Sequence, residues 1–262
     1  DMQDARMAQH RPHPYLDHRL PIAFAHRGGS LEVEENTMPA FEHAVRLGYT
    51  HIELDVHATT DGVVVIHHDD TLERMAGDPR KIGDLDWATL SQVRTKAGAT
   101  LPRLDDLLLS FPGLNVNIEP KSDSVLEPLA DLLRGTNAVS RIGIGCFDPR
   151  RTERLRLMLG DELCWSPAHA GVFRLWLKGW GLPATTGDFQ MVQVPPSYLG
   201  IPIVTRRFVD TAHALGVQVH VWTVDEEAEM ERLLDLSVDA LMTDRPTLLR
   251  TVLERRGQWH GN

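Results

Sequence analysis

The sequence is poor in cysteine, has no long apolar run and carries a deficit of positive charge. Cys146 and Cys164 are the only cysteines among 262 residues, too few for a disulfide framework or a cysteine-rich zinc site. We therefore expect two unpaired, buried thiols, with a single bridge between them as the alternative. No segment approaches the roughly 18 consecutive apolar residues of a membrane-spanning helix, so we expect no transmembrane segment.

The acidic charge balance limits the classes of partner. Lys and Arg total 27 against 37 Asp and Glu, which gives a formal net charge of −10. Nucleic acids and anionic membranes bind basic protein surfaces, and neither is expected as a partner. An anionic small molecule would have to be held by local positive charge. The apolar content of 42% and the charged content of 24% are ordinary for a globular protein.

The first twenty residues differ in character from the rest of the chain. Residues 1–20 are polar, with histidine and proline concentrated between Arg11 and Pro14, and we expect them to form a loose N-terminal arm. Residues 21–262 are expected to form a single domain. The chain begins with Asp1 rather than methionine, so a removed signal peptide stays open. A cytoplasmic location is the expectation, and formation of a homo-oligomer stays open.

From Pro21 onward, short apolar runs rich in branched residues alternate with longer amphipathic runs. This alternation is typical of βαβ units and a parallel sheet. Eight predicted strands favour an α/β fold of the closed (β/α)8 TIM-barrel type, which needs about 250 residues. The predicted strands are Ile22–Ala25, His51–Val56, Val116–Glu119, Ile142–Cys146, Leu163–Trp165, Met191–Val194, Val217–Trp222 and Ala240–Met242. The main predicted helices are Thr37–Leu47, Ser124–Leu133, Pro149–Leu159, Gly171–Gly179, Thr205–Leu215, Glu226–Leu236 and Pro246–Arg255.

The first predicted strand ends in a histidine and an arginine. A barrel places its functional groups at the C-terminal ends of the strands, and His26 and Arg27 stand there, followed by Gly28 and Gly29. This arrangement puts an acid–base group and a cation beside flexible backbone. The alternative for His26 is an ordinary structural histidine.

Three acids occupy neighbouring predicted strands. Glu53 and Asp55 lie two residues apart and face the same side of their strand, and Glu119 ends the next predicted strand. Two carboxylates ~4 Å apart repel by roughly 4 kcal/mol at an effective dielectric near 20, so a shared proton, a cation or solvent must relieve them. A solvated edge strand is the alternative. Three oxygen ligands without cysteine suit a hard cation, Mg²⁺ or Ca²⁺, rather than zinc.

A second imidazole follows the apolar run Val63–Ile66. His68 is the candidate, and the adjacent His67 competes with it because the two would point in opposite directions on extended backbone. Two histidines and a metal ion form a workable apparatus for phosphoryl chemistry, since one removes a proton and the other donates one. The ends of later strands add three weaker candidates, namely Gln193, Trp222 and Asp244.

Several short motifs are more specific together than any one of them is alone. They are His26-Arg27-Gly28, Glu35-Asn36-Thr37, Glu53-Leu54-Asp55-Val56, Thr60-Asp61-Gly62, His68-Asp69, Asn117-Ile118-Glu119-Pro120-Lys121, His220-Val221-Trp222-Thr223-Val224 and the run from Asp239 to Pro246. In this order, from Pro21 to the last predicted helix, they resemble the glycerophosphodiester phosphodiesterase family. Glu34 and Pro120 depart from the family's pattern, but neither change removes a chemical group.

The resemblance implies a fold and a set of residue roles. The fold is a (β/α)8 barrel with a small insertion after the second strand, which fits the irregular stretch from Asp69 to Leu109. One divalent cation, Mg²⁺ or Ca²⁺, would be bound by Glu53, Asp55 and Glu119, and His26 and His68 would be the general base and acid. The implied substrate-binding residues are Arg27 and Lys121 on phosphate oxygens, Glu35 in support, Gln193, and Trp222 at the entrance.

The resemblance also implies the reaction, which is the metal-dependent hydrolysis of a glycerophosphodiester to glycerol 3-phosphate and an alcohol. One alternative is lysophospholipase D activity on the same fold, because the apolar stretch Gly171–Trp180 could receive an acyl chain or a membrane surface. An ordinary barrel helix that packs its apolar face inward is the favoured explanation of that stretch. A second alternative, a catalytically silent barrel that only binds phosphodiesters, does not explain why both histidines and all three acids are present.

Overall fold

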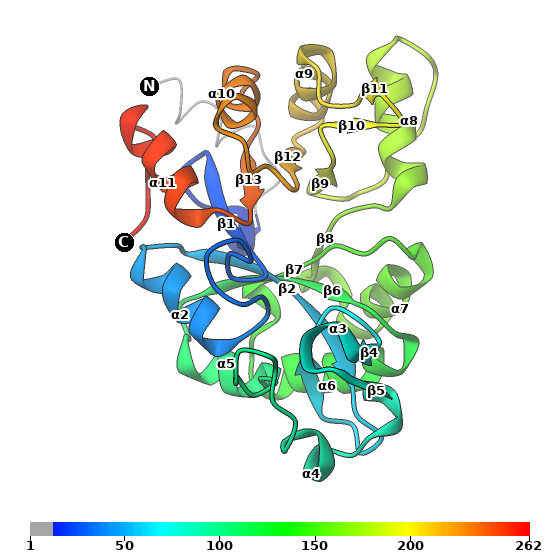
Figure 1. The fold of residues 1–262 in the computed structure, drawn as a ribbon. Helices are drawn as coiled ribbons and strands as arrows, with labels where there is room; N and C mark the ends of the chain where they lie inside the picture. The colour runs from blue at the N-terminus through cyan, green and yellow to red at the C-terminus, as the bar shows by residue number, and fades with distance from the viewer. Residues whose placement is uncertain (1–12) are drawn as a thin grey trace.

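The structure, a computed structural model, describes residues 13–262 and shows eight parallel strands arranged as a nearly closed barrel (Figure 1). Neighbouring strands pair in the order β8-β7-β6-β2-β1-β13-β12-β9. At the seam between the two outer strands, the hydroxyl of Ser166 accepts a hydrogen bond from the backbone N–H of Gln193 at 2.9 Å. The strands are β1 (Ile22–His26), β2 (His51–Ala58), β6 (Asn115–Pro120), β7 (Ile142–Ile144), β8 (Cys164–Trp165), β9 (Met191–Val194), β12 (Gln218–Val221) and β13 (Ala240–Thr243).

Alternation along the strands separates two apolar layers. The outward side chains of β2, such as Ile52 and Leu54, are fully buried beneath the helices. The inward layer is small and contains Phe24, Met191 and Met242. All eight predicted strands are confirmed, with ends that shift by a few residues. Cys146 and Cys164 are buried and free, as expected.

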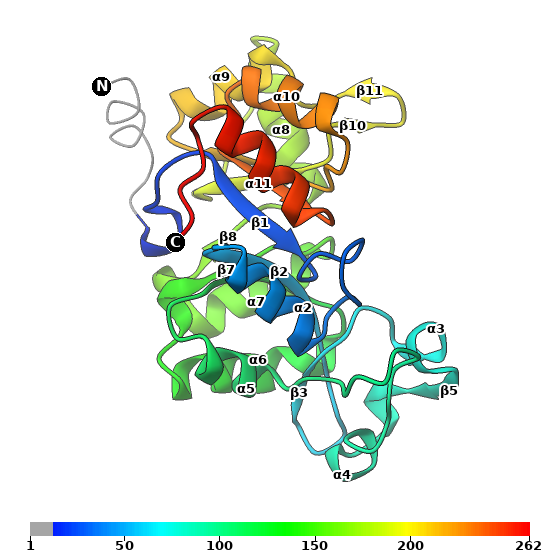
Figure 2. The ribbon, with the colours of Figure 1, turned by 60° about the vertical axis from the view of Figure 1, so that its left-hand side comes forward.

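Helices cover the outer face of the barrel (Figures 1 and 2). Caps that the sequence provides begin several of them: the side chain of Thr37 accepts from Ala40 N–H, and that of Asp148 accepts from Arg150 N–H. None of the helices in the described part of the chain is long and apolar enough to cross a membrane. The covering helices are α2 (Met38–Arg46), α6 (Leu126–Gly135), α7 (Pro149–Leu159), α8 (His169–Gly179), α9 (Arg206–Ala214), α10 (Glu227–Asp235) and α11 (Pro246–Arg255), all near their predicted positions.

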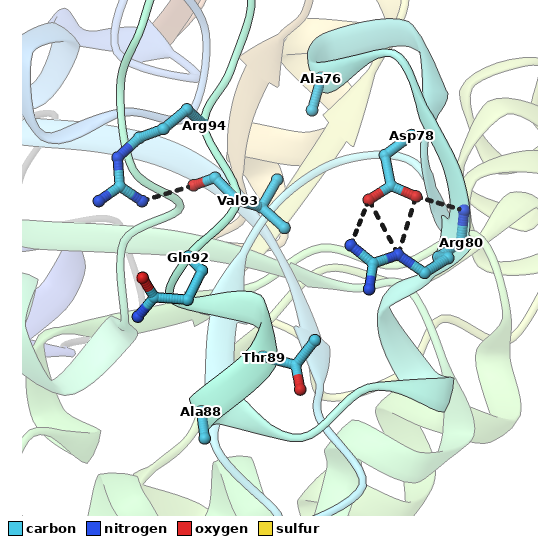
Figure 3. Close-up of a pocket in the computed structure, with 8 residues that line it drawn as sticks. All are labelled: Ala76, Asp78, Arg80, Ala88, Thr89, Gln92, Val93 and Arg94. Atoms are coloured by element: carbon cyan, nitrogen blue, oxygen red, sulfur yellow. Dashed lines mark hydrogen bonds and ion pairs between the residues drawn. The ribbon is translucent and has the colours of Figure 1, made fainter.

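The insertion between β2 and β6 folds over a small apolar cluster of its own, which includes Leu72, Ile82 and Leu90. It stands away from the barrel at the lower right of Figure 2. A shallow hollow of about 670 Å³ lies in it, lined by residues such as Asp78, Arg80 and Arg94 (Figure 3). The insertion contains β3 (Val64–Ile66), β4 (Thr71–Leu72), α3 (Glu73–Ala76), β5 (Asp78–Lys81) and α4 (Trp87–Leu90). The following helix α5 (Leu104–Ser110) packs against the barrel, with Leu104 and Leu107 in its core.

The segment before β1 is not the loose arm that its composition predicts, at least for residues 13–20. Tyr15 is fully buried and its ring packs beside Phe24 inside the barrel, where its hydroxyl accepts a hydrogen bond from Asn117 at 3.2 Å. Leu16 and Leu20 are also buried. The prediction was wrong there because isolated apolar residues in a polar stretch give no periodic signal. Residues 1–12 lie outside the described part of the chain, and the single domain stays a prediction.

A further hairpin follows β9 and leads into α9. Its strands are β10 (Ser197–Tyr198) and β11 (Ile201–Pro202), which pair antiparallel. The hairpin lies between α9 and α8 in Figure 1 and projects from the barrel at the upper right of Figure 2. Because it follows the C-terminal end of β9, it belongs to the face of the barrel on which active sites of this fold are built.

Candidate active site

Ionisable side chains gather at the C-terminal ends of four neighbouring strands, in the order β6-β2-β1-β13. The strand register explains the gathering. His26 of β1 lies opposite Glu53 of β2, and Asp55 of β2 lies opposite Glu119 of β6. Asp244 directly follows β13, which pairs with β1. The parallel sheet thus brings together residues that lie more than 200 positions apart in the chain.

The three predicted acids converge. Glu53, Asp55 and Glu119 each offer a carboxylate oxygen, and these oxygens lie within 4.8 Å of one another. Glu53 and Asp55 are buried. Burial raises the pKa of Glu53, and the neighbouring carboxylates of Asp55 and Glu119 raise it further, against the opposing effect of His26 and Arg27. The cluster therefore stores like-charge repulsion that a cation would relieve.

Two cations contact this cluster. Arg27 places its Nε 3.2 Å from Asp55 Oδ2 and donates from a terminal nitrogen to Glu35 Oε1 at 3.1 Å. Lys121 lies 3.3 Å from Asp55 Oδ1 and 3.2 Å from Glu119 Oε2. Burial lowers the pKa of the Lys121 ammonium, but Asp55 and Glu119 outweigh burial and raise it overall. Both cations can reach a bound anion from beside the acids.

The turn after β1 fixes the position of Arg27. Arg27 has φ of 50° and Gly28 has φ of 84°, a region that residues with side chains rarely adopt. A Cβ on Gly28 would lie 2.7 Å from Ala40 Cβ, so α2 approaches this turn closely. The backbone N–H of Arg27 donates to Glu53 Oε2 at 3.2 Å. Gly28 is thus needed for the close packing of this turn against α2.

His26 is held in place by a carboxylate. Its Nδ1 lies 2.7 Å from Asp244 Oδ1, and its Nε2 lies 3.5 Å from Glu53 Oε2. Burial alone would lower the pKa of His26, but Glu53 and Asp244 outweigh burial and raise it to about 9. Because the carboxylate of Asp244 can only accept, Nδ1 carries a proton and Nε2 faces the acids.

His68 repeats this arrangement. Its Nδ1 lies 2.7 Å from Asp69 Oδ1, and its backbone carbonyl accepts from His57 Nε2 at 3.1 Å. The competing candidate, His67, is buried and donates from Nε2 to the carbonyl of Thr71. His67 is therefore a structural residue, and His68 is the imidazole left near the acids.

Two residues of this region were not identified from the sequence. Arg74 of the insertion donates to Asp69 at 2.7 Å and to Glu35 Oε1 at 2.7 Å, so it links the partner of His68 to the partner of Arg27. Asn36 donates from Nδ2 to Asp55 Oδ2 at 2.9 Å. Asn36 lies in a quoted motif that could have marked it, whereas nothing in the sequence singles out Arg74.

The other predicted residues lie across the mouth. Gln193 lies in β9 at the seam, and its Oε1 lies only 2.0 Å from the position that a Cβ on Gly145 would take. Trp222 follows β12 and makes an edge contact with Phe147, with ring centroids 5.5 Å apart. Neither is an ionisable group, so they can shape or contact a ligand but not transfer its protons.

The donor set fits a hard divalent cation. Glu53, Asp55 and Glu119 provide oxygen ligands at spacings that one ion could bridge, and oxygen donors suit Mg²⁺ or Ca²⁺. The neighbouring imidazoles of His26 and His68 are already engaged by carboxylates through Nδ1. The site therefore has the composition of a cation centre flanked by two oriented acid–base groups.

Comparison with known proteins agrees with this chemistry. A model of the glycerophosphoryl diester phosphodiesterase family matches residues 26–248. A protein of Mycobacterium tuberculosis named "Probable glycerophosphodiester phosphodiesterase 2" is 40% identical, over 94% of this chain and 96% of its own. A human lysophospholipase D is 29% identical, over 87% of this chain and 85% of its own.

Solved structures show the same fold. A glycerophosphodiester phosphodiesterase from Agrobacterium tumefaciens superposes with a TM-score of 0.77 at 23% identity, over 90% of this chain and 100% of its own. A phosphodiesterase from Oleispira antarctica, solved in complex with the product sn-glycerol-3-phosphate, superposes with a TM-score of 0.73 at 22% identity, over 90% of this chain and 97% of its own. The strand arrangement is thus that of a TIM barrel. The chain is a phosphodiester hydrolase, and it belongs to the glycerophosphoryl diester phosphodiesterase family.

Proposed function

We propose that the protein hydrolyses glycerophosphodiesters to glycerol 3-phosphate and an alcohol, with one divalent cation on Glu53, Asp55 and Glu119 and with His26 and His68 as the acid–base pair. One observation carries the proposal. Two histidines each present Nδ1 to a carboxylate at 2.7 Å, beside a cluster of three carboxylates. The glycerol 3-phosphate bound to the related structure supports a glycerol-bearing substrate.

The two histidines divide the proton transfers. One imidazole removes a proton from the attacking hydroxyl through Nε2, and the other donates a proton to the leaving alkoxide. The attacking group is either the glycerol 2-hydroxyl, which gives a cyclic phosphate that water then opens, or water itself. In both routes the P–O bond to the alcohol breaks, and the alcohol leaves with the donated proton. Asp244 and Asp69 keep the rings oriented and stabilise each imidazolium as it forms.

Charge explains how an acidic protein binds an anion. Three carboxylates together with the side chains of Arg27 and Lys121 sum to −1, and a divalent cation changes this sum to +1. When bound, the cation would stabilise the negative charge that develops on the phosphoryl oxygens. Arg27 and Lys121 would bind the phosphate oxygens from the side, with Glu35 supporting Arg27. Gln193 and Trp222 would border the alcohol group.

A substrate and metal panel tests the proposal. Glycerophosphocholine and glycerophosphoethanolamine are incubated with the protein in Mg²⁺, in Ca²⁺ and in EDTA, and glycerol 3-phosphate is measured. We expect turnover with at least one of the two metals and none in EDTA. Full activity in EDTA would contradict the role of the cation. Binding without turnover under every condition would instead identify a silent phosphodiester-binding barrel.

The mouth also favours a second candidate substrate, a lysophospholipid. Phe147 is 52% exposed beside Trp222 at the entrance, and the predicted apolar stretch forms α8, where Phe173 is 57% exposed. These side chains could border an acyl chain. Measuring hydrolysis of lysophosphatidylcholine against glycerophosphocholine separates lysophospholipase D activity from the first proposal.

A further inference from the structure

We infer that the β10–β11 hairpin docks the protein on the surface of a phospholipid bilayer, with the active-site mouth turned toward the headgroups. The hairpin stands clear of the barrel at the upper right of Figure 2. Its tip is apolar: Leu199 is 85% exposed, Ile201 is 55% exposed and Tyr198 is 53% exposed. Three large apolar side chains within four residues of a projecting tip present a surface that water solvates poorly.

The surrounding sequence has no charge. From Gln190 to Thr205 the chain contains no Asp, Glu, Lys, Arg or His, although such acidic and basic residues are frequent elsewhere. The first charged residues after this stretch are Arg206 and Arg207, both exposed at the start of α9. Both are engaged within the protein, since Arg206 donates to the carbonyls of Asp235 and Leu236 and Arg207 stacks on Trp180. The hairpin itself is therefore apolar and uncharged, as suits insertion among acyl chains.

The turn at the tip exposes a leucine in a backbone conformation that leucine rarely adopts. Leu199 has φ of 49° and Gly200 has φ of 78°, so both central residues have the left-handed conformation in which hairpin turns usually contain Asn, Asp or Gly. Leucine is disfavoured there both by its backbone conformation and by its exposure to water. A role for the Leu199 side chain in an apolar medium would explain its presence.

The hairpin is continuous with the mouth of the barrel. The ring of Tyr198 lies 6.0 Å from that of His169, which lies 5.6 Å from Phe147, which in turn lies 5.5 Å from Trp222. Tyr198 lies in β10, and the other three residues follow β8, β7 and β12. A bilayer that receives the hairpin tip would therefore extend along this rim and present its headgroups near the phosphodiester site.

The size of the tip selects a lipid surface over a protein partner. A stable protein–protein interface buries about 800 Å² on each partner, over about 20–30 residues. A two-residue turn and its flanking side chains cannot supply such an area. Insertion into a bilayer needs only a few apolar side chains, because each leaves water separately. Docking itself does not require catalysis. The advantage of docking, which is access to phosphodiester headgroups, rests on the proposed function.

Vesicle binding tests the inference without an activity measurement. The protein is sedimented with phosphatidylcholine vesicles at increasing lipid concentration, and the bound fraction is measured. We expect the wild type to bind and the Leu199→Asn, Ile201→Ser variant to lose about tenfold or more in lipid partitioning. Asparagine is favoured at a φ near 50°, so this variant keeps the turn. Leu109→Gln, which removes another exposed leucine on α5 (71% exposed), is the matched control and should bind like the wild type.

Three results would overturn the inference. The wild type could stay in the supernatant at every lipid concentration, or the hairpin variant could bind as strongly as the wild type. The hairpin variant could also convert a dimer into a monomer in size-exclusion chromatography while vesicle binding is unchanged, which would assign the tip to a second copy of the chain. Hydrolysis of soluble glycerophosphocholine by the hairpin variant is measured separately, so a failure of the proposed function is distinguished from a failure of docking.

Discussion

The mouth of the barrel has two halves of opposite chemistry. The neighbouring strands β6, β2, β1 and β13 carry ionisable residues at or near their C-terminal ends, namely Glu119, Asp55, His26 and Asp244, of which Asp55 is buried and the other three are half-buried. The first three residues after each of the other four strands, β12, β9, β8 and β7, are uncharged, and they include Trp222, Ser166 and Phe147. Because each half is contiguous in the sheet, the charged groups share one low-dielectric region and do not alternate with apolar ones.

This division assigns different tasks to the two halves. Electrostatic interactions are stronger where water is excluded, so a contiguous charged half concentrates the field on one reacting group. Under the proposed function, the uncharged half would contact the remainder of the substrate, and the charged half would carry out the acid–base chemistry. The predictions below test whether the two halves can be altered independently.

The largest effect is expected for a metal ligand in the charged half. Glu119→Gln should lower kcat/KM by on the order of 10³, because a cation contributes several kcal/mol of transition-state stabilisation. Steady-state kinetics with glycerophosphocholine measure the loss. Glu42→Gln removes an exposed acid of α2 that pairs with Arg46 and should leave activity unchanged. An unaffected Glu119→Gln enzyme would remove this residue from the site.

The two histidines should follow. His26→Ala and His68→Ala should each lower kcat by about 10²–10⁴, the range expected for loss of a general acid or base. His43, which contacts Glu32 at 2.7 Å on the surface, provides a matched control as His43→Ala. If both catalytic variants lose less than tenfold while remaining folded, the acid–base assignment is wrong.

A third prediction concerns His13, in the buried segment before β1. His13 accepts from Tyr15 N–H at Nδ1 (3.1 Å) and lies at Nε2 2.9 Å from the carbonyl of Glu162, a pattern that only the neutral ring satisfies. Burial lowers the pKa of His13 below its ordinary 6.5. The unfolded chain therefore binds the extra proton first, and stability is present above about pH 6.5 and lost as the pH falls below it.

Urea unfolding of the wild type and of His13→Asn between pH 7.5 and pH 5.5 measures this loss. Asparagine keeps a hydrogen-bond acceptor at the cap and does not titrate. The wild type should lose up to about 1.4 kcal/mol of unfolding free energy more per pH unit than His13→Asn below pH 6.5. Parallel pH profiles for the two proteins would show that His13 titrates alike in the folded and unfolded chains.

The smallest effect is expected in the uncharged half. Phe147→Ala removes an exposed ring from the rim and should change kcat/KM for soluble glycerophosphocholine by less than about threefold, since exposed positions contribute about 0.5 kcal/mol or less. The same kinetic assay used for Glu119→Gln checks it. A loss comparable to that of the histidine variants would show that the two halves act as one unit.

Sequence reasoning identified the strands and the convergence of the acids. The alternation in β2 is a local pattern, and the placement of functional residues at the C-terminal ends of strands is general to barrels of this type. The same reasoning also placed His26 and Asp244 at neighbouring strand ends. Strand alternation alone left His67 open beside His68, and the family resemblance favoured His68, since the choice depends on how β3 pairs antiparallel to β2. Arg74 was missed because its contacts form only when the insertion folds back onto the mouth.

The buried N-terminal segment and the apolar hairpin were missed for a related reason. Tyr15 reaches the interior because Gly143 leaves room for its ring: a Cβ there would lie 2.5 Å from it. That complementarity spans more than a hundred residues and leaves no local pattern. Leu199 is an apolar residue in a short turn, and only its exposure in the folded chain distinguishes it from an ordinary core residue.

The central claim is that Glu53, Asp55 and Glu119 share one divalent cation, and calorimetric titration of Mg²⁺ and Ca²⁺ into chelator-treated protein tests it most directly. For at least one of these metals we expect a single ion per chain in the wild type, with binding lost or weakened at least about tenfold in Glu119→Gln. The Glu42→Gln control should retain the wild-type isotherm. A wild-type protein that binds neither metal, or a Glu119→Gln protein that binds as tightly as the wild type, would contradict the claim.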